Sequence, residues 1–251
     1  MPDIRRLWII QIKMYNKNVH EILMRIGEKD IVLEIGGWVR PFNRANWVVD
    51  VMPYETRGEG GADGGAKEYF SQETWIQRDI CAREPLPFKD KEIDFVICSH
   101  TLEDVRDPVF VCSEICRVGK QGYIEVPSKL AELSLGIESN NYAGYYHHRW
   151  IIEIENKKLN FIFKPHFIHS YWKYHLPPSY GRKLAPEKRI QWFFWEESFE
   201  FAEKIDVEYK MLRRKIEDSI RLQRVYSEYR YQIEKLKEPL RKIRARFFNN
   251  P

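Results

Sequence analysis

Long apolar runs are missing from this sequence of 251 residues. No segment approaches the roughly 20 consecutive apolar residues of a membrane-spanning helix. Near the start, the apolar residues of segment 1–10 are followed directly by Gln11 and Lys13, so that run is too short for a secretory signal. These absences argue against a helical membrane protein, and we expect a cytoplasmic one.

Cysteine is scarce, with only four in the chain. Two fall in or beside strand-like runs and two lie four residues apart on an expected helix: Cys81, Cys98, Cys112 and Cys116. No second pair with metal-ligand spacing accompanies them, which disfavours a cysteine zinc site or a disulfide framework. We expect reduced thiols, most of them buried.

The usual phosphate-binding glycine motifs are also absent. The connection 53–71 holds five glycines, but no Gly-Lys-Ser/Thr ends it, and we expect a mobile loop with a short helix at most. The loop Gly36-Gly-Trp-Val-Arg-Pro lacks the G-x-G-x-x-G spacing of dinucleotide-binding enzymes. Neither segment therefore predicts a pyrophosphate site.

The composition fits one enzyme domain with an appendage. With 43% apolar residues the chain can bury one substantial core. Its formal charge of +4 is uneven, because the segment from Val207 onward carries thirteen Lys and Arg against six Asp and Glu. We therefore expect residues 28–206 to form the main domain and residues 207–251 to form a basic amphipathic helical tail.

Five strand-like runs alternate with helices or long connections. They are Ile31–Gly36, Asn46–Val51, Trp75–Ile80, Phe95–His100 and Tyr123–Pro127, with a helical pattern at Pro108–Val118. Such alternation predicts an α/β fold whose parallel sheet is joined by right-handed crossovers.

The flanking segments follow other patterns. Residues 3–27 have the apolar spacing of an amphipathic helix, which we expect to cap the core as a unit of residues 1–27. Two runs around Asn156-Lys157-Lys158 predict an antiparallel hairpin. We further expect substrate-side insertions at 129–148 and 165–198, and a last strand at 199–205.

Two of the strand-like runs end in acids. Glu34 and Gly36 close the first run, and Asp50 closes the second. The carboxyl ends of parallel strands open into the crevice where α/β sheets bind ligands. Glycine permits a close approach of the backbone, and a carboxylate can accept two hydrogen bonds from a ribose diol. This pattern predicts a nucleotide-type cofactor site.

The longest distinctive stretch runs from Leu86-Pro-Phe-Lys-Asp-Lys-Glu-Ile-Asp-Phe to Arg106-Asp-Pro108 and continues in Glu114-Ile-Cys-Arg-Val-Gly-Lys-Gln-Gly-Tyr-Ile-Glu-Val-Pro127. With the acids above, residues 28–128 resemble class I S-adenosylmethionine-dependent methyltransferases, type 11-like, of the small-molecule and glycan-modifying branch. The resemblance implies a Rossmann-like, doubly wound, mostly parallel sheet of the seven-stranded type. One departure is Trp38, which stands where the family has a second glycine.

The resemblance also implies S-adenosylmethionine as cofactor and assigns its contacts. The expected residues are Glu34, Gly36 and Gly37 at the methionine end, Asp50 and Val51 at the ribose, Asp79 and Ile80 at the adenine, and Ser99 and His100 beneath the cofactor. An acid on each successive strand tip suits a ligand that carries a sulfonium, an ammonium, a diol and an adenine amine.

Methyl transfer depends mainly on positioning, and it needs a base only if the acceptor must lose a proton. His100 is the first candidate base, since histidine titrates near neutrality. Tyr146, His147 and His148 form a second catalytic candidate group after the fifth strand. Adjacent histidines in a strand point to opposite faces, so we expect at most one in the pocket and no metal site.

The function that these features favour is methylation of a small-molecule or glycan-like acceptor, at oxygen. One alternative is a nucleic-acid methyltransferase that uses the tail as a clamp, although the slightly negative main domain makes nucleic acid a disfavoured partner. Another is a catalytically silent cofactor-binding module. The basic tail fits either peripheral contact with the inner face of a membrane or a packing helix in a homo-oligomer.

Overall fold

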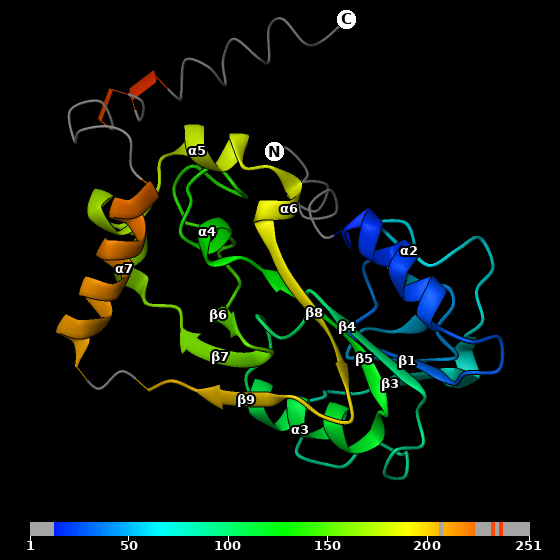
Figure 1. Ribbon diagram of the computed structural model, residues 1–251. Coiled ribbons are helices and arrows are strands. Elements are labelled where there is room, and N and C mark those ends of the chain that lie inside the picture. Colours follow the sequence, from blue (N-terminus) through cyan, green and yellow to red (C-terminus); the bar gives the residue numbers. More distant parts are fainter. Residues whose placement is uncertain (1–12, 206–207, 224–231, 234–235, 238–251) are drawn as a thin grey trace, which may run out of the picture.

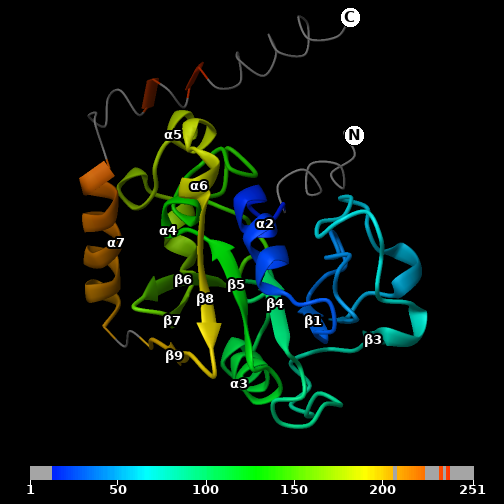
Figure 2. The same cartoon turned by 45° about the vertical axis from the view of Figure 1, so that its right-hand side comes forward.

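The computed structural model describes residues 13–205, 208–223, 232–233 and 236–237. These residues form two β-sheets with helices packed around them (Figures 1 and 2). The N-terminal part of the expected first helix, residues 3–12, and most of the expected basic tail lie outside the described residues.

The central sheet has the strand order β3-β2-β1-β4-β5-β8. Its strands are β1 (Val32–Ile35), β2 (Trp47–Asp50), β3 (Trp75–Gln77), β4 (Phe95–Ser99), β5 (Gln121–Pro127) and β8 (Ile190–Glu196). The first five are parallel, and β8 runs antiparallel to β5. The predicted α/β fold with a mostly parallel sheet is confirmed, but the described residues supply six strands to this sheet and not seven.

Strand β1 shows why its sequence is continuously apolar. Leu33 and Ile35 pack into one core with the helix α3 (Pro108–Val118), whereas Val32 packs into a second core with the helix α2 (Asn16–Arg25). Both faces of the strand are thus covered, and a strand buried on both faces cannot alternate with polar residues. The observed α2 begins at Asn16, within the predicted helical segment.

Strand β8 corrects the expected insertion at 165–198. Residues 190–196 belong to the central sheet, where Phe193 pairs with Ile124 and Trp195 with Gly122. The indole of Trp195 is 1% exposed, and a Cβ at position 122 would lie 2.8 Å from it. The aromatic residues here therefore build the core, because the glycine of β5 leaves room for them.

A second sheet has the order β6-β7-β9. Strands β6 (Trp150–Glu155) and β7 (Lys158–Phe163) form the predicted antiparallel hairpin. Its two turn residues, Asn156 and Lys157, have φ of 50° and 63°, the conformation that a tight two-residue hairpin turn requires. The expected last strand is β9 (Glu200–Glu203), which pairs parallel with β7.

The remaining helices are short, apart from the last. They are η1 (Tyr54–Thr56), η2 (Gln72–Thr74), α4 (Lys129–Glu132), η3 (His166–His169), η4 (Trp172–Tyr174), α5 (Pro178–Lys183), α6 (Pro186–Arg189) and α7 (Tyr209–Gln223). Helix α7 buries Ile216 and Ile220 in a cluster with Phe167 and Ile168, so this part of the tail packs on the body of the protein (Figure 1).

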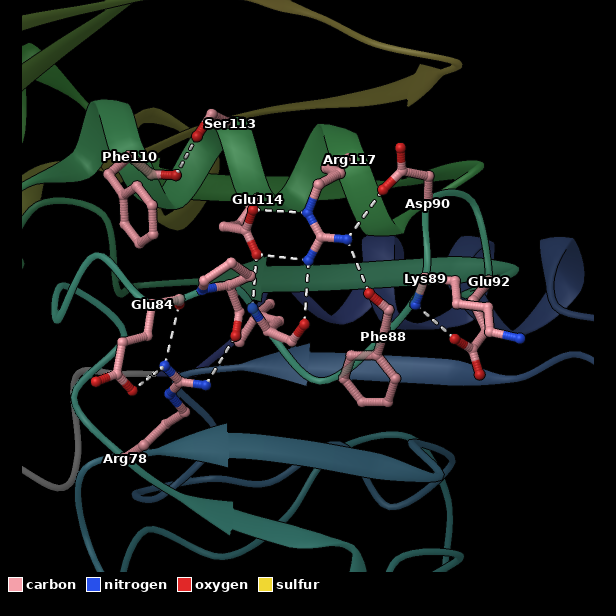
Figure 3. A network of polar contacts seen from close by, with 12 residues as sticks. Arg78, Glu84, Phe88, Lys89, Asp90, Glu92, Phe110, Ser113, Glu114 and Arg117 are labelled. Carbon is pink, nitrogen blue, oxygen red and sulfur yellow. Dashed lines mark hydrogen bonds and ion pairs between the residues drawn. The ribbon is translucent and has the colours of Figure 1, made fainter.

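Helix α3 is tied to the preceding connection by an arginine (Figure 3). Arg117 binds both carboxylate oxygens of Glu114 at 2.7 Å and donates to the carbonyl oxygens of Leu86 and Phe88. Glu114 accepts from the Leu86 amide at 2.7 Å. Burial alone would raise the pKa of Glu114, but these hydrogen bonds outweigh it and lower the pKa.

We expect Arg117→Gln to lower the free energy of unfolding by about 2–3 kcal/mol, since a partly buried carboxylate and two carbonyls lose a charged donor. The matched control is Arg83→Gln, because Arg83 is 77% exposed and pairs with Asp107 at the surface. That change should cost less than about 1 kcal/mol. Urea denaturation measures both, and equal losses would contradict the assigned role.

Candidate functional site

A cleft of about 490 Å³ opens at the carboxyl ends of β1, β2 and β4. It lies beside the point where the strand order reverses between β1 and β4, the usual ligand position in such sheets. Its lining includes these predicted residues: Glu34, Gly36, Asp50, Val51, Asp79, Ile80, Ser99, His100 and His147. Three predicted residues do not line it: Gly37, Tyr146 and His148.

The two glycines after β1 are required by their neighbours. Gly36 has φ of 81°, and a Cβ there would lie 2.0 Å from Thr101 Oγ1. A Cβ on Gly37 would lie 2.3 Å from Glu34 Oε2. Gly36 thus lets the loop approach the tip of β4, and Gly37 leaves room for the buried carboxyl group of Glu34.

Trp38, the departure from the family pattern, connects this loop to the second strand. Its backbone N–H donates to Asp50 Oδ2 at 3.0 Å, and its indole N–H donates to Thr56 Oγ1 at 2.9 Å. Asp50 also accepts from the Met52 amide at 2.8 Å. Burial raises the pKa of Asp50, and these amides oppose the shift. Each carboxylate oxygen keeps a further lone pair for a ligand in the cleft.

Glu34 is an unusual strand-tip acid because it is only 3% exposed. One oxygen accepts from the Phe42 amide at 2.8 Å. Desolvation, reinforced by the nearby charges of Asp50 and Asp63, raises its pKa to about 8. At neutral pH the carboxyl group is therefore largely protonated and can donate as well as accept.

Arg106 is a cleft residue that sequence reasoning missed. Its guanidinium pairs with Asp79 Oδ2 at 2.7 Å and donates to the Cys81 carbonyl at 2.9 Å. The Cys81 amide donates to the other Asp79 oxygen at 2.8 Å. The acid predicted at the adenine edge is therefore already paired, and the flat guanidinium lies beside it. Arginine in the loop after β4 carries no local signal for this contact.

His100 is held between two acids. Its Nε2 is 3.1 Å from Glu125 Oε1, and its Nδ1 is 3.4 Å from Glu103 Oε1. Burial would lower the pKa of His100, but the two carboxylates outweigh it and raise the pKa to about 10. Both ring nitrogens then carry protons at neutral pH, so the geometry contradicts the prediction of His100 as a general base.

The carboxylate of Glu125 also ties the site to the N-terminal region. It is 0% exposed and accepts from the hydroxyl of Tyr123, from Asn18 Nδ2 at 3.3 Å and from the Tyr15 amide at 3.3 Å. Asn18 lies on α2, so one buried carboxylate joins that helix, β5 and the residue after β4. His100 itself has φ of 52°, a backbone conformation that needs such support.

The histidine pair at 147–148 does not lie in a strand, which corrects the expectation about opposite faces. The two rings lie 4.5 Å apart at an interplanar angle of 84°. His148 is buried, with Nδ1 2.6 Å from Glu132 Oε1, and Tyr146 is 49% exposed outside the cleft. Tyr146 and His148 are therefore not placed for catalysis in the cleft. His147 does line the cleft.

His147 differs electrostatically from His100. Burial and the charge of His148 lower the pKa of His147 to about 3, so its imidazole is neutral at physiological pH. In the described part of the chain, one group of three side chains could hold a metal ion: Asp104, His147 and His148. Residues 147–148 do not form the strand from which the absence of a metal site was expected.

Comparison with known proteins gives one family match. Residues 61–124, which include β3, β4 and α3 and reach into β5, match the model of a methyltransferase domain. No curated protein matches the chain. Among the described residues, no helix is long and apolar enough to cross a membrane.

Several solved structures share limited similarity with the chain. A chain from the complex between the Trm112 methyltransferase activator of Haloferax volcanii and a methyltransferase is 18% identical over 50% of this chain and 60% of that chain, with a TM-score of 0.32. An S-adenosylmethionine-dependent methyltransferase of Aquifex aeolicus is 14% identical over 51% of this chain and 75% of that chain, with a TM-score of 0.32. An S-adenosylmethionine-dependent methyltransferase of Mesorhizobium loti is 11% identical over 47% of this chain and 56% of that chain, with a TM-score of 0.32.

These TM-scores are too low to define the fold, and the match spans less than two thirds of the Haloferax and Mesorhizobium chains. The strand order itself defines a Rossmann-like sheet with a ligand cleft at its switch point. The match of residues 61–124 to a methyltransferase domain agrees with this fold, and S-adenosylmethionine is the cofactor expected for such a domain.

The ionisation of Glu34 predicts a pH dependence of stability. Between pH 4.5 and about 8 the folded protein retains a proton that the unfolded chain has released. The free energy of unfolding should therefore fall as pH rises through this window, by up to about 1.4 kcal/mol per unit, and level off above it. Glu34→Gln keeps the shape of the protonated carboxyl and should remove this component.

Urea denaturation of both proteins across that window isolates the contribution, because their other titrating groups are the same. A wild-type minus variant difference that does not change with pH would rule out the assigned ionisation of Glu34.

Proposed function

We propose that the cleft binds S-adenosylmethionine and that the protein transfers its methyl group to an oxygen of a small-molecule or glycan-like acceptor. The observation that carries this proposal is the convergence of Glu34, Asp50 and Asp79, from three successive strand tips, on one cleft. A volume of about 490 Å³ lies within the usual range for small-molecule sites.

In this proposal each acid serves a different part of the cofactor. Glu34 and the Gly36 backbone take the methionine end, and Asp50 with Val51 takes the ribose diol. Asp79 and the Ile80 backbone take the adenine edge. Arg106, which is 58% exposed at its side chain, either stacks on the adenine or turns outward when the cofactor enters.

The chemistry is an in-line displacement at the methyl carbon. An acceptor oxygen forms the new bond to carbon while the bond to sulfur breaks, and the sulfonium becomes a neutral thioether. His100 as imidazolium does not take the acceptor proton. Its proposed role is to fix the tip of β4 beneath the reacting groups through Glu103 and Glu125.

The far end of the cleft supports a hydroxylated acceptor. Asp104, His147 and Arg149 line it and offer hydrogen bonds of both kinds. Near this segment, Tyr142 and Tyr146 are about half exposed, with ring centroids 6.4 Å apart. These half-exposed tyrosines lie outside the cleft but close to His147 in the sequence, and tyrosine rings suit the apolar side of a sugar ring, which supports a glycan-like acceptor.

We also propose a cytoplasmic location with peripheral membrane contact through the basic tail. Helix α7 exposes Met211 at 49% and Leu222 at 82%, among exposed Lys210, Arg214 and Arg221. Exposed apolar and basic side chains on one helix suit an anionic lipid surface. Self-association and the alternative use of the tail as a nucleic-acid clamp remain predictions, since 224–231, 234–235 and 238–251 lie outside the described residues.

Co-sedimentation with vesicles tests the membrane contact. The full chain should pellet with anionic vesicles, and Lys210→Glu with Arg214→Glu should lower the membrane partition coefficient at least about 30-fold, because each basic charge removed costs about 1 kcal/mol. Neutral vesicles are the control. Equal binding of both proteins to both vesicle types would contradict a role for α7.

Asp50→Ala should weaken binding of S-adenosylmethionine by about 1.5–3 kcal/mol, the range for hydrogen bonds to a charged group. Calorimetry on the folded variant measures this loss. Asp218→Ala, which removes an exposed acid of α7, is the control and should leave the affinity unchanged. Unchanged affinity in folded Asp50→Ala would refute the placement of the ribose.

A further inference from the structure

Two segments meet at the acceptor end of the cleft and bring three metal-ligating side chains together. The carbonyl of Glu103 accepts from the amides of Arg149 at 2.8 Å and Trp150 at 3.1 Å. These bonds hold the loop after β4 against the residues before β6. As a result Asp104 Oδ2 lies 3.7 Å from His147 Nε2, and Asp104, His147 and His148 each offer a ligand atom within 4.8 Å of the others.

The buried histidine of this group is oriented by a further carboxylate. Glu132 places Oε1 2.6 Å from His148 Nδ1, and its Oε2 is 2.5 Å from Lys164 Nζ. Since Nδ1 faces Glu132, Nε2 is the ring nitrogen left for a ligand. A carboxylate bound to the outer nitrogen is the arrangement that supports histidine ligands in metalloproteins.

The surroundings favour a cation. Glu103 is 1% exposed, and neither of its carboxylate oxygens has a hydrogen-bond partner; His100 Nδ1 lies 3.4 Å from one of them. Glu138 adds another carboxylate, 3.7 Å from His147 Nδ1. Buried carboxyl groups such as these are stabilised by a nearby cation, and a metal ion would add to the cationic groups of His100, His148 and Lys164.

We propose that Asp104, His147 and His148 bind one divalent first-row transition metal ion, with open coordination positions facing the acceptor end of the cleft. Two imidazoles and one carboxylate suit such ions and disfavour Mg²⁺ or Ca²⁺, which prefer oxygen ligands. Bonds from such a metal ion to imidazole nitrogen are about 2.0–2.1 Å long, so the three ligand atoms must move closer together than their present separations of up to 4.8 Å. The side chains of Asp104 and His147, 39% and 17% exposed, have room to do so.

The role of this ion rests on the proposed function. An acceptor hydroxyl bound to it would have a lowered pKa and would release its proton to solvent water. The resulting metal-bound oxygen then attacks the methyl carbon, and the electron pair of the carbon–sulfur bond stays on sulfur. The ion thus supplies the deprotonation that His100, already carrying two ring protons, does not provide.

The test uses the full chain after treatment with a chelator. Titration with Co²⁺, followed by its visible absorption, and with Zn²⁺, followed by calorimetry, should give one saturable site, and Mg²⁺ should not compete. Asp104→Asn and His147→Gln should each weaken binding at least about 100-fold, more than loss of an outer-shell partner. His20→Gln removes an exposed imidazole on α2 and should change nothing.

Thermal unfolding checks that each variant is folded, and the wild-type Co²⁺ spectrum reports imidazole ligation without any variant. Wild-type protein that shows no saturable Co²⁺ or Zn²⁺ binding would overturn the site, as would ligand variants that bind like wild type. Binding of S-adenosylmethionine is measured on the same samples. Failure of the metal site alone leaves this binding intact, whereas failure of the proposed function abolishes it. Full methyl transfer by the metal-free protein would overturn the catalytic role of the ion while leaving methyl transfer intact.

Discussion

The parallel pairing of β1 with both β2 and β4 is the constraint on which the site depends. Leu33 stands opposite Trp47 on one side and Val96 on the other, so the strands advance together. All three then end at one edge of the sheet. Because β1 is buried on both faces, a shift of register would expose its apolar residues, so the acids at these strand ends are held at one cleft.

Burial and neighbouring charges set the ionisation of the titratable groups at this edge. Desolvation raises the pKa of Glu34, so it is a largely neutral group at the tip of β1. His100 lies between two carboxylates, and its pKa rises into the range of a permanent cation. Burial and the charge of His148 lower the pKa of His147. The cleft thus has a cofactor side of acids and an acceptor side with a neutral imidazole.

The connection between the two sides is a short path through the backbone. His100 follows β4 directly, and Glu103, three residues later, anchors the segment that carries His147. These backbone hydrogen bonds hold the two sides of the cleft in a fixed relation. In the proposed reaction this rigidity favours a fixed angle between the methyl donor and the acceptor oxygen.

The sequence alone was enough for the five parallel strands, the hairpin and the acids at the strand tips, because periodicity and strand ends are local properties. It was not enough for β8, whose aromatic pattern fits an insertion until Gly122 and Trp195 are brought together. It also misjudged the ionisation of His100 and the conformation of the pair 147–148, although, as expected, only one histidine of that pair lines the cleft. The charge of His100 depends on Glu125, 25 residues away, and the direction of His148 depends on Glu132. Ionisation and side-chain direction are set by neighbours that only the tertiary structure brings into contact.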